Sequence, residues 1–196
     1  MLISAVRDDL CLAFANTLSW RGSETPAEEV GAFADLLKWL ERAHIGPMEE
    51  VRSWSRDHGR KAAKLFAEAI AIREAIFRAF SALANGQAVP EQDFALVRDA
   101  LADAPARRQL ARLDTGYAWQ VQQLRPSTPY LLAPVLWSAA DLMLNAPHRR
   151  IRQCANDKCL WLFLDESKSG TRRWCDMSAC GNRAKAQRHY ARSKQA

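Results

Sequence analysis

The sequence lacks long apolar runs, internal repeats and low-complexity segments. No stretch approaches the roughly 20 uncharged apolar residues that a membrane-spanning helix needs. The N-terminal segment is apolar only in part, because Arg7, Asp8 and Asp9 interrupt it, and it shows neither a basic leader nor a small-residue cleavage site. These absences argue against a membrane protein and against an exported one. We therefore expect a cytoplasmic protein.

The sequence also lacks the motifs of common enzyme classes. We find no paired nucleophile and base, no open metal site and no phosphate-binding loop. We therefore expect a protein that is not an enzyme. The chain has 196 residues, of which 48% are hydrophobic, enough for one good core with a small satellite module, or for two modest domains.

Cysteine is scarce, but four of the five cysteines form two Cys-x4-Cys pairs. Cys154 and Cys159 make the first pair and Cys175 and Cys180 make the second, with fifteen residues between the pairs. Thiols stay reduced in the cytoplasm, where grouped cysteines are metal ligands more often than disulfides. Four thiolates on two tight turns suit a tetrahedral, structural zinc ion, with sulfur about 2.3 Å from the metal. Cys11 stands apart on an apolar helix face, and we expect it to be a small core residue.

Other interpretations of the cysteine pairs are weaker. The spacing resembles neither ferredoxin pattern, which disfavours an iron–sulfur cluster. A catalytic zinc keeps an open coordination position, whereas four thiolates close the site. His148 and His189 lie near enough in the sequence to replace a ligand, but the cysteine set is complete without them. The prediction is one structural zinc.

The first three quarters of the chain read as mainly α-helical, with one small β-hairpin. Apolar spacing near 3.6 residues and stop signals such as Asn85-Gly86 predict the helices, and Asp114-Thr-Gly116 predicts the hairpin turn. Thr25-Pro-Ala-Glu28 resembles a capping box that would open a helix. The expected helices cover residues 9–19, 33–43, 48–57, 60–83, 90–102 and 131–144, and the hairpin covers residues 110–121.

The last quarter reads as a small finger. We expect a short strand, the first cysteine pair, strands over 160–164 and 171–174, and the second pair opening a basic helix. This order suggests a treble-clef-like zinc finger. Accordingly we predict a helical domain over residues 1–147 and a zinc finger with a C-terminal basic helix over residues 148–196.

Positive charge is concentrated in this finger. Residues 149–196 contain twelve Lys or Arg and four Asp or Glu, whereas the rest of the chain contains sixteen and eighteen. The whole excess of the net +6 charge therefore lies in the finger, which favours a polyanionic partner. A merely solvated basic tail is the plainer alternative.

A basic helix after Cys180 would place its cations on one side. At 3.6 residues per turn, Lys185, Arg188 and Arg192 line one stripe, which suits phosphate contacts. A solvated helix face would show the same pattern. Trp161, Phe163 and Trp174 could stack on nucleotides, although a module this small needs aromatic residues for its own core.

The finger closely resembles the CGNR zinc-finger family. The resemblance is carried by the segment IRQCANDKCLWLFLDESKSGTRRWCDMSACGNRAKAQRHYAR, including Cys180-Gly-Asn-Arg183. Earlier segments, LCLAFANTLSWR and DLLKWLERA, look like the companion ABATE domain. The resemblance spans nearly the whole chain and implies a bacterial, stress-linked transcription regulator that binds DNA through the finger and senses a ligand through the N-terminal domain.

The residues expected to contact nucleic acid are the finger's cations, namely Arg172, Arg173, Arg183, Lys185, Arg188 and Arg192. A homodimer would double a small DNA contact, and we favour one. An RNA-binding or protein-interaction module is the alternative, because zinc fingers serve many ends.

The resemblance also implies a ligand site in the helical domain. Asn16, Thr17 and Arg21 match the family, and Arg21 could hold a carboxylate or phosphate with Asn16 beside it. The same side chains could instead cap the first helix and satisfy buried backbone groups. Ala13 stands where the family usually carries an acidic residue, so the ligand, if any, would differ. Arg73 is a further, weaker candidate.

Overall fold

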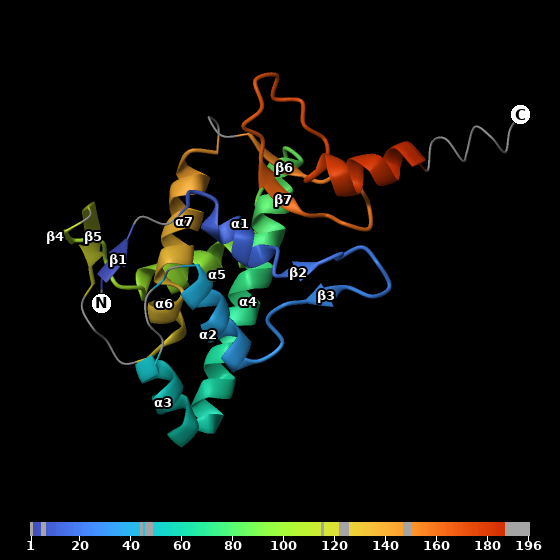
Figure 1. Ribbon diagram of the computed structural model, residues 1–196. Coiled ribbons are helices and arrows are strands. Elements are labelled where there is room, and N and C mark those ends of the chain that lie inside the picture. Colours follow the sequence, from blue (N-terminus) through green and yellow to red (C-terminus); the bar gives the residue numbers. More distant parts are fainter. Residues whose placement is uncertain are drawn as a thin grey trace, which may run out of the picture.

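The computed structural model describes residues 2–4, 7–43, 45, 49–114, 116–121, 126–146 and 150–186. Figure 1 shows helices surrounding one long central helix, with small strand pairs at the periphery. The helices are α1 (Leu10–Ala15), α2 (Phe33–Arg42), α3 (Glu49–Asp57), α4 (Gly59–Ala84), α5 (Glu91–Ala102), α6 (Thr128–Leu131) and α7 (Ala133–Leu144). The strands are β1 (Leu2–Ser4), β2 (Leu18–Ser19), β3 (Ala27–Glu28), β4 (Gln109–Leu113), β5 (Gly116–Gln120), β6 (Ile151–Gln153) and β7 (Leu162–Leu164). The prediction of a mainly helical fold is confirmed.

Helix α4 is the scaffold of the molecule. It is rich in alanine, glutamate, lysine and arginine, which favour helix, and α1, α2, α5 and β6 all pack against it. Its buried residues include Ile72, Ile76 and Phe80. The helix ends at Asn85-Gly86 as the sequence predicts, because Gly86 takes a φ of +66°, which a side chain would disfavour.

Helix α2 confirms the period-3.6 pattern that predicts it. Leu36, Leu37 and Leu40 are buried, and Phe33 packs partly buried against the same core. The helix predicted over residues 131–144 is confirmed as α7, apart from its first two residues, and the short helix α6 precedes it. Ser127 caps α6 by accepting a hydrogen bond from the amide of Tyr130, and only Leu132 separates α6 from α7.

The capping box predicted at Thr25–Glu28 is wrong, because this segment is extended. Strand β3 pairs antiparallel with β2, with Leu18 opposite Glu28. Glu28 makes two hydrogen bonds with Arg73 on α4, at 2.7 and 2.8 Å. A charged bond to a buried guanidinium outweighs the weak local preference of a Pro-containing turn for helix.

The predicted hairpin is present and joins a third strand. Strands β4 and β5 pair antiparallel across a two-residue turn, and β1 adds to the other side of β5 in the order β1-β5-β4. Ile3 and Val121 pack with Ala133 and Trp137, which attaches this sheet to α7.

Strands β6 and β7 form the core of the finger and rest on the helices. They pair antiparallel, with Arg152 opposite Phe163, and Ile151 and Leu162 belong to the main hydrophobic core. The predicted strand over 171–174 is wrong. Here Arg172 donates its amide to the Asp165 carboxylate and Arg173 offers its carbonyl to Ala155, so no ladder forms.

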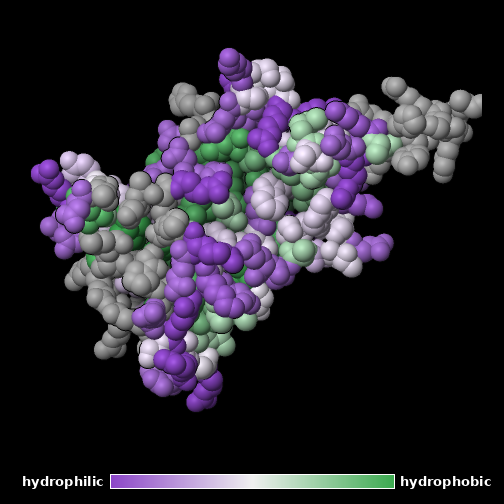
Figure 2. Space-filling model, in the orientation of Figure 1, coloured by the Kyte–Doolittle hydropathy of each residue, from purple (hydrophilic) through white to green (hydrophobic). Residues whose placement is uncertain are grey.

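Among the described residues, no helix combines the length and the apolar character needed to cross a membrane. Figure 2 shows hydrophilic residues over much of the visible face, with hydrophobic residues in its upper middle and in smaller patches elsewhere.

Candidate metal centre

The four paired cysteines converge on one point. Their Sγ atoms all lie within 4.8 Å of one another, and those of Cys159 and Cys175 are 3.7 Å apart, those of Cys175 and Cys180 3.8 Å. Sulfurs bound tetrahedrally at about 2.3 Å from zinc would be about 3.8 Å apart. A disulfide would need about 2.05 Å. The donor set and its spacing fit one structural zinc ion held by four thiolates.

The close spacing of the four cysteine sulfurs favours a bound cation among them. Hydrogen bonding with Cys175 lowers the pKa of Cys159 to about 5. Conversely, hydrogen bonding with Cys159, burial and the negative charge of Cys159 raise the pKa of Cys175. Burial raises the pKa of Cys180 to about 11. Neighbouring thiolates repel one another at this distance, and a divalent cation among them removes that repulsion.

Backbone and side-chain hydrogen bonds shape the two cysteine turns. In the first, the amide of Cys154 donates to Trp161 at 2.8 Å, and Asn156 donates its side-chain amide towards the sulfur of Cys180 at 3.6 Å. In the second, the Asp176 carboxylate accepts the amide of Ala179 at 2.8 Å. This is an N-terminal cap, and it begins the turn that carries Cys180.

Gly181 of the CGNR run lies close to the side chains of Met177 and Trp174. A Cβ at this position would lie 2.7 Å from Sδ of Met177 and 3.4 Å from the ring of Trp174. A π-helical turn, Met177–Gly181, precedes the described start of the basic helix at residues 182–186. The metal ligand Cys180 therefore fixes where that helix begins.

Asp165 closes the loop between the cysteine pairs. It is buried, at 5% exposure, and accepts hydrogen bonds from the hydroxyl and amide of Ser167 and the amide of Arg172. The bond from Ser167 is the largest cause that lowers the pKa of Asp165. This carboxylate therefore holds Arg172 near Cys175.

The N-terminal part contributes a loop to the zinc centre. Trp20 packs against the cysteine cluster and takes a φ of +54°, unusual for a residue with a side chain. Gly22 donates its amide to Lys158 at 3.2 Å, and a Cβ there would lie 1.9 Å from the carbonyl oxygen of Asp157. No sequence pattern predicts this contact. The structure shows that Gly22, two residues after Trp20, is where the loop approaches the finger closely.

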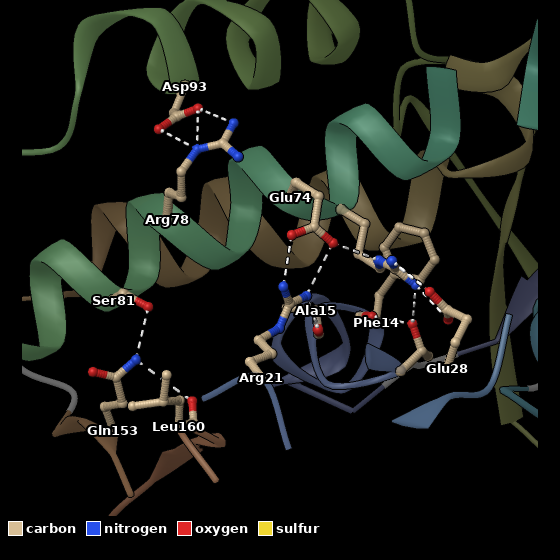
Figure 3. A network of polar contacts seen from close by, with 12 residues as sticks. Phe14, Ala15, Arg21, Glu28, Glu74, Arg78, Ser81, Asp93, Gln153 and Leu160 are labelled. Carbon is tan, nitrogen blue, oxygen red and sulfur yellow. Dashed lines mark hydrogen bonds and ion pairs between the residues drawn. The ribbon is translucent and has the colours of Figure 1, made fainter. Parts of the chain in front are cut away.

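Arg21 anchors that loop to α4 through Glu74 (Figure 3), and Arg73 of α4 adds a bond to Thr17. Arg21 forms an ion pair with Glu74 at 2.6 Å. Glu74 also accepts from Arg73 at 2.9 Å, and Arg73 bonds Glu28 and the hydroxyl of Thr17. Arg73 is buried, at 2% exposure. These paired charges stiffen the segment that touches the finger.

Asn16 joins α1 to the finger directly. Its side chain donates to the carbonyl of Leu162 at 2.8 Å and accepts the amide of Leu162 at 3.0 Å. Thr17 donates its hydroxyl to Phe14 at 2.8 Å, and Arg21 donates to Ala15 at 2.8 Å. All three predicted ligand residues thus have partners within the protein. A role for them in ligand binding stays a prediction.

Three of the predicted nucleic-acid residues are exposed close in sequence to the cysteine ligands. Arg173, Arg183 and Lys185 are exposed. Arg173 lies over the ring of Trp174 at 5.4 Å, and Arg183 over that of Trp20 at 4.5 Å. The structure therefore brings these cations to the surface beside the metal ligands.

The other three members of that set are Arg172, Arg188 and Arg192. Arg172 is exposed, but its guanidinium bonds the carbonyls of Trp174 and Cys175 and lies 4.6 Å over Phe163. It stabilises the turn before Cys175. The predicted cations Arg188 and Arg192 lie outside the described residues, as do His148 and His189.

The finger's aromatic residues divide between core and surface. Phe163 is buried at 7% exposure and Trp174 packs partly buried on the cysteines, whereas Trp161 is 38% exposed.

Cys11 is completely buried in the main core, where burial raises the pKa of its thiol to about 12. The prediction that Cys11 is a core residue is confirmed.

A helical body and a four-thiolate centre together define a zinc-finger protein with an N-terminal helical domain. The model of the ABATE family, described as "Putative stress-induced transcription regulator", matches residues 8–146. That of the CGNR zinc finger matches residues 150–193. The chain therefore belongs to the ABATE family and carries a CGNR zinc finger, as the sequence resemblance implies. No curated protein matches the chain.

Proposed function

We propose that this protein is a transcription regulator that binds duplex DNA through the zinc-anchored finger. The observation that carries the proposal is the position of the exposed cations. Arg183 and Lys185 follow the ligand Cys180 within five residues, and Arg173 precedes Cys175 by two. Zinc binding thereby fixes three surface cations in one small region. Fixed cations contact a regular array of phosphates at lower entropic cost than a flexible tail.

We further propose that residues 1–147 and 148–196 form two domains, of which the first senses a small ligand. A cleft of about 660 Å³ supports the proposed ligand site, since Ala13 of α1, Asn16 just after α1, Trp39 of α2 and Trp161 of the finger all line it. Cys175 also borders this cleft. A ligand seated there would touch both parts and bias the position of the finger.

The test is a salt titration of binding to duplex DNA by the zinc-loaded protein. Neutralising about three to five phosphates per finger gives a log–log slope of the binding constant on salt near −3 to −4. Replacing both Arg173 and Lys185 by Ala is expected to reduce the magnitude of that slope by about two.

The matched control replaces Lys38 and Lys64 by Ala. Both side chains are exposed, on α2 and α4 respectively, so the net charge falls by the same amount. The control is expected to keep the wild-type slope. Equal effects of both double variants, or no salt-dependent binding by the wild type, would contradict a DNA interface at the finger. Preference for single-stranded RNA in competition would favour the alternative, an RNA-binding module.

A further inference from the structure

Strand β4 leaves one side of its sheet open. The strand order is β1-β5-β4, so among the described residues β4 pairs with β5 alone. In Figure 1 the hairpin lies at the opposite side of the molecule from β6 and β7, with β4 outermost. A strand edge of this kind offers backbone donors and acceptors to another strand.

Two large apolar side chains are exposed on this hairpin, next to the open edge. Leu110 is 60% exposed and Tyr117 is 68% exposed. Leu110 lies opposite Trp119, and Tyr117 lies opposite Arg112, so these side chains share one face of the hairpin. Exposed apolar residues beside an open strand edge are typical of a surface that another chain covers.

The register shows which backbone groups point outward. Leu113 and Gly116 flank the two-residue turn and are opposite each other, which makes them a hydrogen-bonded pair. Because the direction of the backbone groups alternates along an antiparallel strand, Ala111 also faces β5. The amide and carbonyl groups of Leu110 and Arg112 therefore point to the open edge.

A second copy of β4 can pair with this edge around a two-fold axis in three registers. Centring on Leu110 places Arg108 opposite Arg112, and centring on Arg112 places that residue opposite itself. Both registers oppose like charges, which destabilises a strand pair. Centring on Ala111 instead places Leu110 opposite Arg112 and Arg108 opposite Asp114.

In this last register the outward backbone groups can form hydrogen bonds between the two copies, and opposite charges face each other. Leu110 and Arg112 of one copy meet Arg112 and Leu110 of the other as hydrogen-bonded pairs. Arg108 and Asp114 are exposed and have no ion pair among the described residues, so each gains an opposite charge. The arrangement repeats itself by symmetry, as a two-fold interface requires.

We propose that two copies of this protein associate through their β4 edges, in antiparallel register centred on Ala111, to form a six-stranded sheet. The finger lies at the other side of each copy (Figure 1). Both zinc centres therefore stay accessible in the dimer.

Three single-cysteine variants test the register. Residue 111 faces its own symmetry mate as a non-hydrogen-bonded pair, with Cα atoms about 4.5 Å apart, a separation that a disulfide spans. Under mild oxidation the full-length, zinc-loaded A111C variant is expected to cross-link into a dimer of twice 22.1 kDa. L110C and R112C are expected to cross-link little, because neither faces itself. Cross-linking chiefly by L110C or by R112C would overturn the proposed register.

Charge exchange tests the interface without new cysteines. R108D and D114R are each expected to raise the dimer dissociation constant about tenfold, since two symmetric pairs are lost. The double variant R108D/D114R restores both pairs and is expected to return within about threefold of wild type. Sedimentation equilibrium measures all four proteins, and circular dichroism confirms their helical fold. A monomeric wild type, or a dimer that the single variants do not weaken, would overturn the proposal.

Discussion

Asn16 and Leu162 exchange two hydrogen bonds across 146 residues of sequence. The side-chain amide of Asn16 presents one donor and one acceptor, as the backbone of a neighbouring strand would. Both residues are buried, at 6% and 1% exposure. This pair ties the end of α1 to strand β7 and therefore ties the helical part to the finger.

Replacing Asn16 by Ala should weaken the molecule. The change leaves the amide and the carbonyl of Leu162 buried without partners, at about 1–3 kcal/mol for each group. We expect the free energy of unfolding, from urea denaturation of the zinc-loaded protein, to fall by about 3 kcal/mol. The control is Asn145→Ala, because among the described residues Asn145 bonds only Asp141, at an exposed helix end. This variant should change stability by less than about 0.5 kcal/mol. Equal losses would contradict the role of Asn16.

Gly22→Ala should displace the loop that packs on the finger. A Cβ at Gly22 would meet the carbonyl oxygen of Asp157 at 1.9 Å, so the backbone must move. Overpacking of this kind costs about 1–3 kcal/mol. Gly31→Ala is the matched control, since a Cβ there meets nothing within 4 Å. Thermal unfolding of both variants checks the difference, and an unchanged Gly22→Ala midpoint would contradict the observed contact.

Glu74 should make stability depend on pH. Burial alone would raise the pKa of Glu74, but hydrogen bonds and charge from Arg21 and Arg73 outweigh burial and hold this pKa below its ordinary value of 4.5. The ionised Glu74 carboxylate therefore contributes fully to the free energy of unfolding above pH 4.5. This contribution is lost as the pH falls through the lowered pKa that Glu74 has in the folded protein. Glu74→Gln should be less stable than wild type at neutral pH, and the gap should narrow below pH 4.5.

The measurement is thermal unfolding of both proteins over this pH range. Glu24→Gln serves as the control, because Glu24 is exposed and has no ion pair among the described residues. Its difference from wild type should stay near zero at every pH. A Glu74→Gln gap that is constant with pH would show that the ion pairs with Arg21 and Arg73 do not contribute in this way.

Cys175→Ser should lose most of the bound zinc, because a hydroxyl is a poor substitute for a thiolate ligand. Metal analysis is expected to give one zinc per wild-type chain and substantially less in this variant. Cys11→Ala should retain one zinc, since Cys11 is buried in the helical core away from the centre. Wild-type stoichiometry in Cys175→Ser would contradict the four-thiolate site.

The sequence predicts those features whose signal is local. Leu36, Leu37 and Leu40 repeat with the helical period, and α2 follows from that pattern alone. The zinc centre is equally predictable, because the ligand chemistry requires four converging thiolates and the two Cys-x4-Cys pairs supply them. Gly86 likewise marks the end of α4 through a backbone angle that only glycine readily adopts.

The contacts between the helical part and the finger are different. Glu28 reads locally as the end of a capping box, but its long-range bond to Arg73 decides its structure. Trp20 reads as an ordinary apolar residue, yet it packs on the zinc ligands. Such contacts depend on where distant elements meet, and no short-range pattern records that.

The central claim is that zinc organises a surface that binds DNA. A genome-wide map of the tagged protein tests it most directly, comparing wild type with Cys175→Ser and with the Arg173→Ala, Lys185→Ala double variant at equal abundance. We predict discrete peaks for wild type that disappear in both variants, the first by losing the metal and the second by losing the cations while keeping it. Peaks that persist unchanged in both variants, or no peaks for wild type, would contradict the claim.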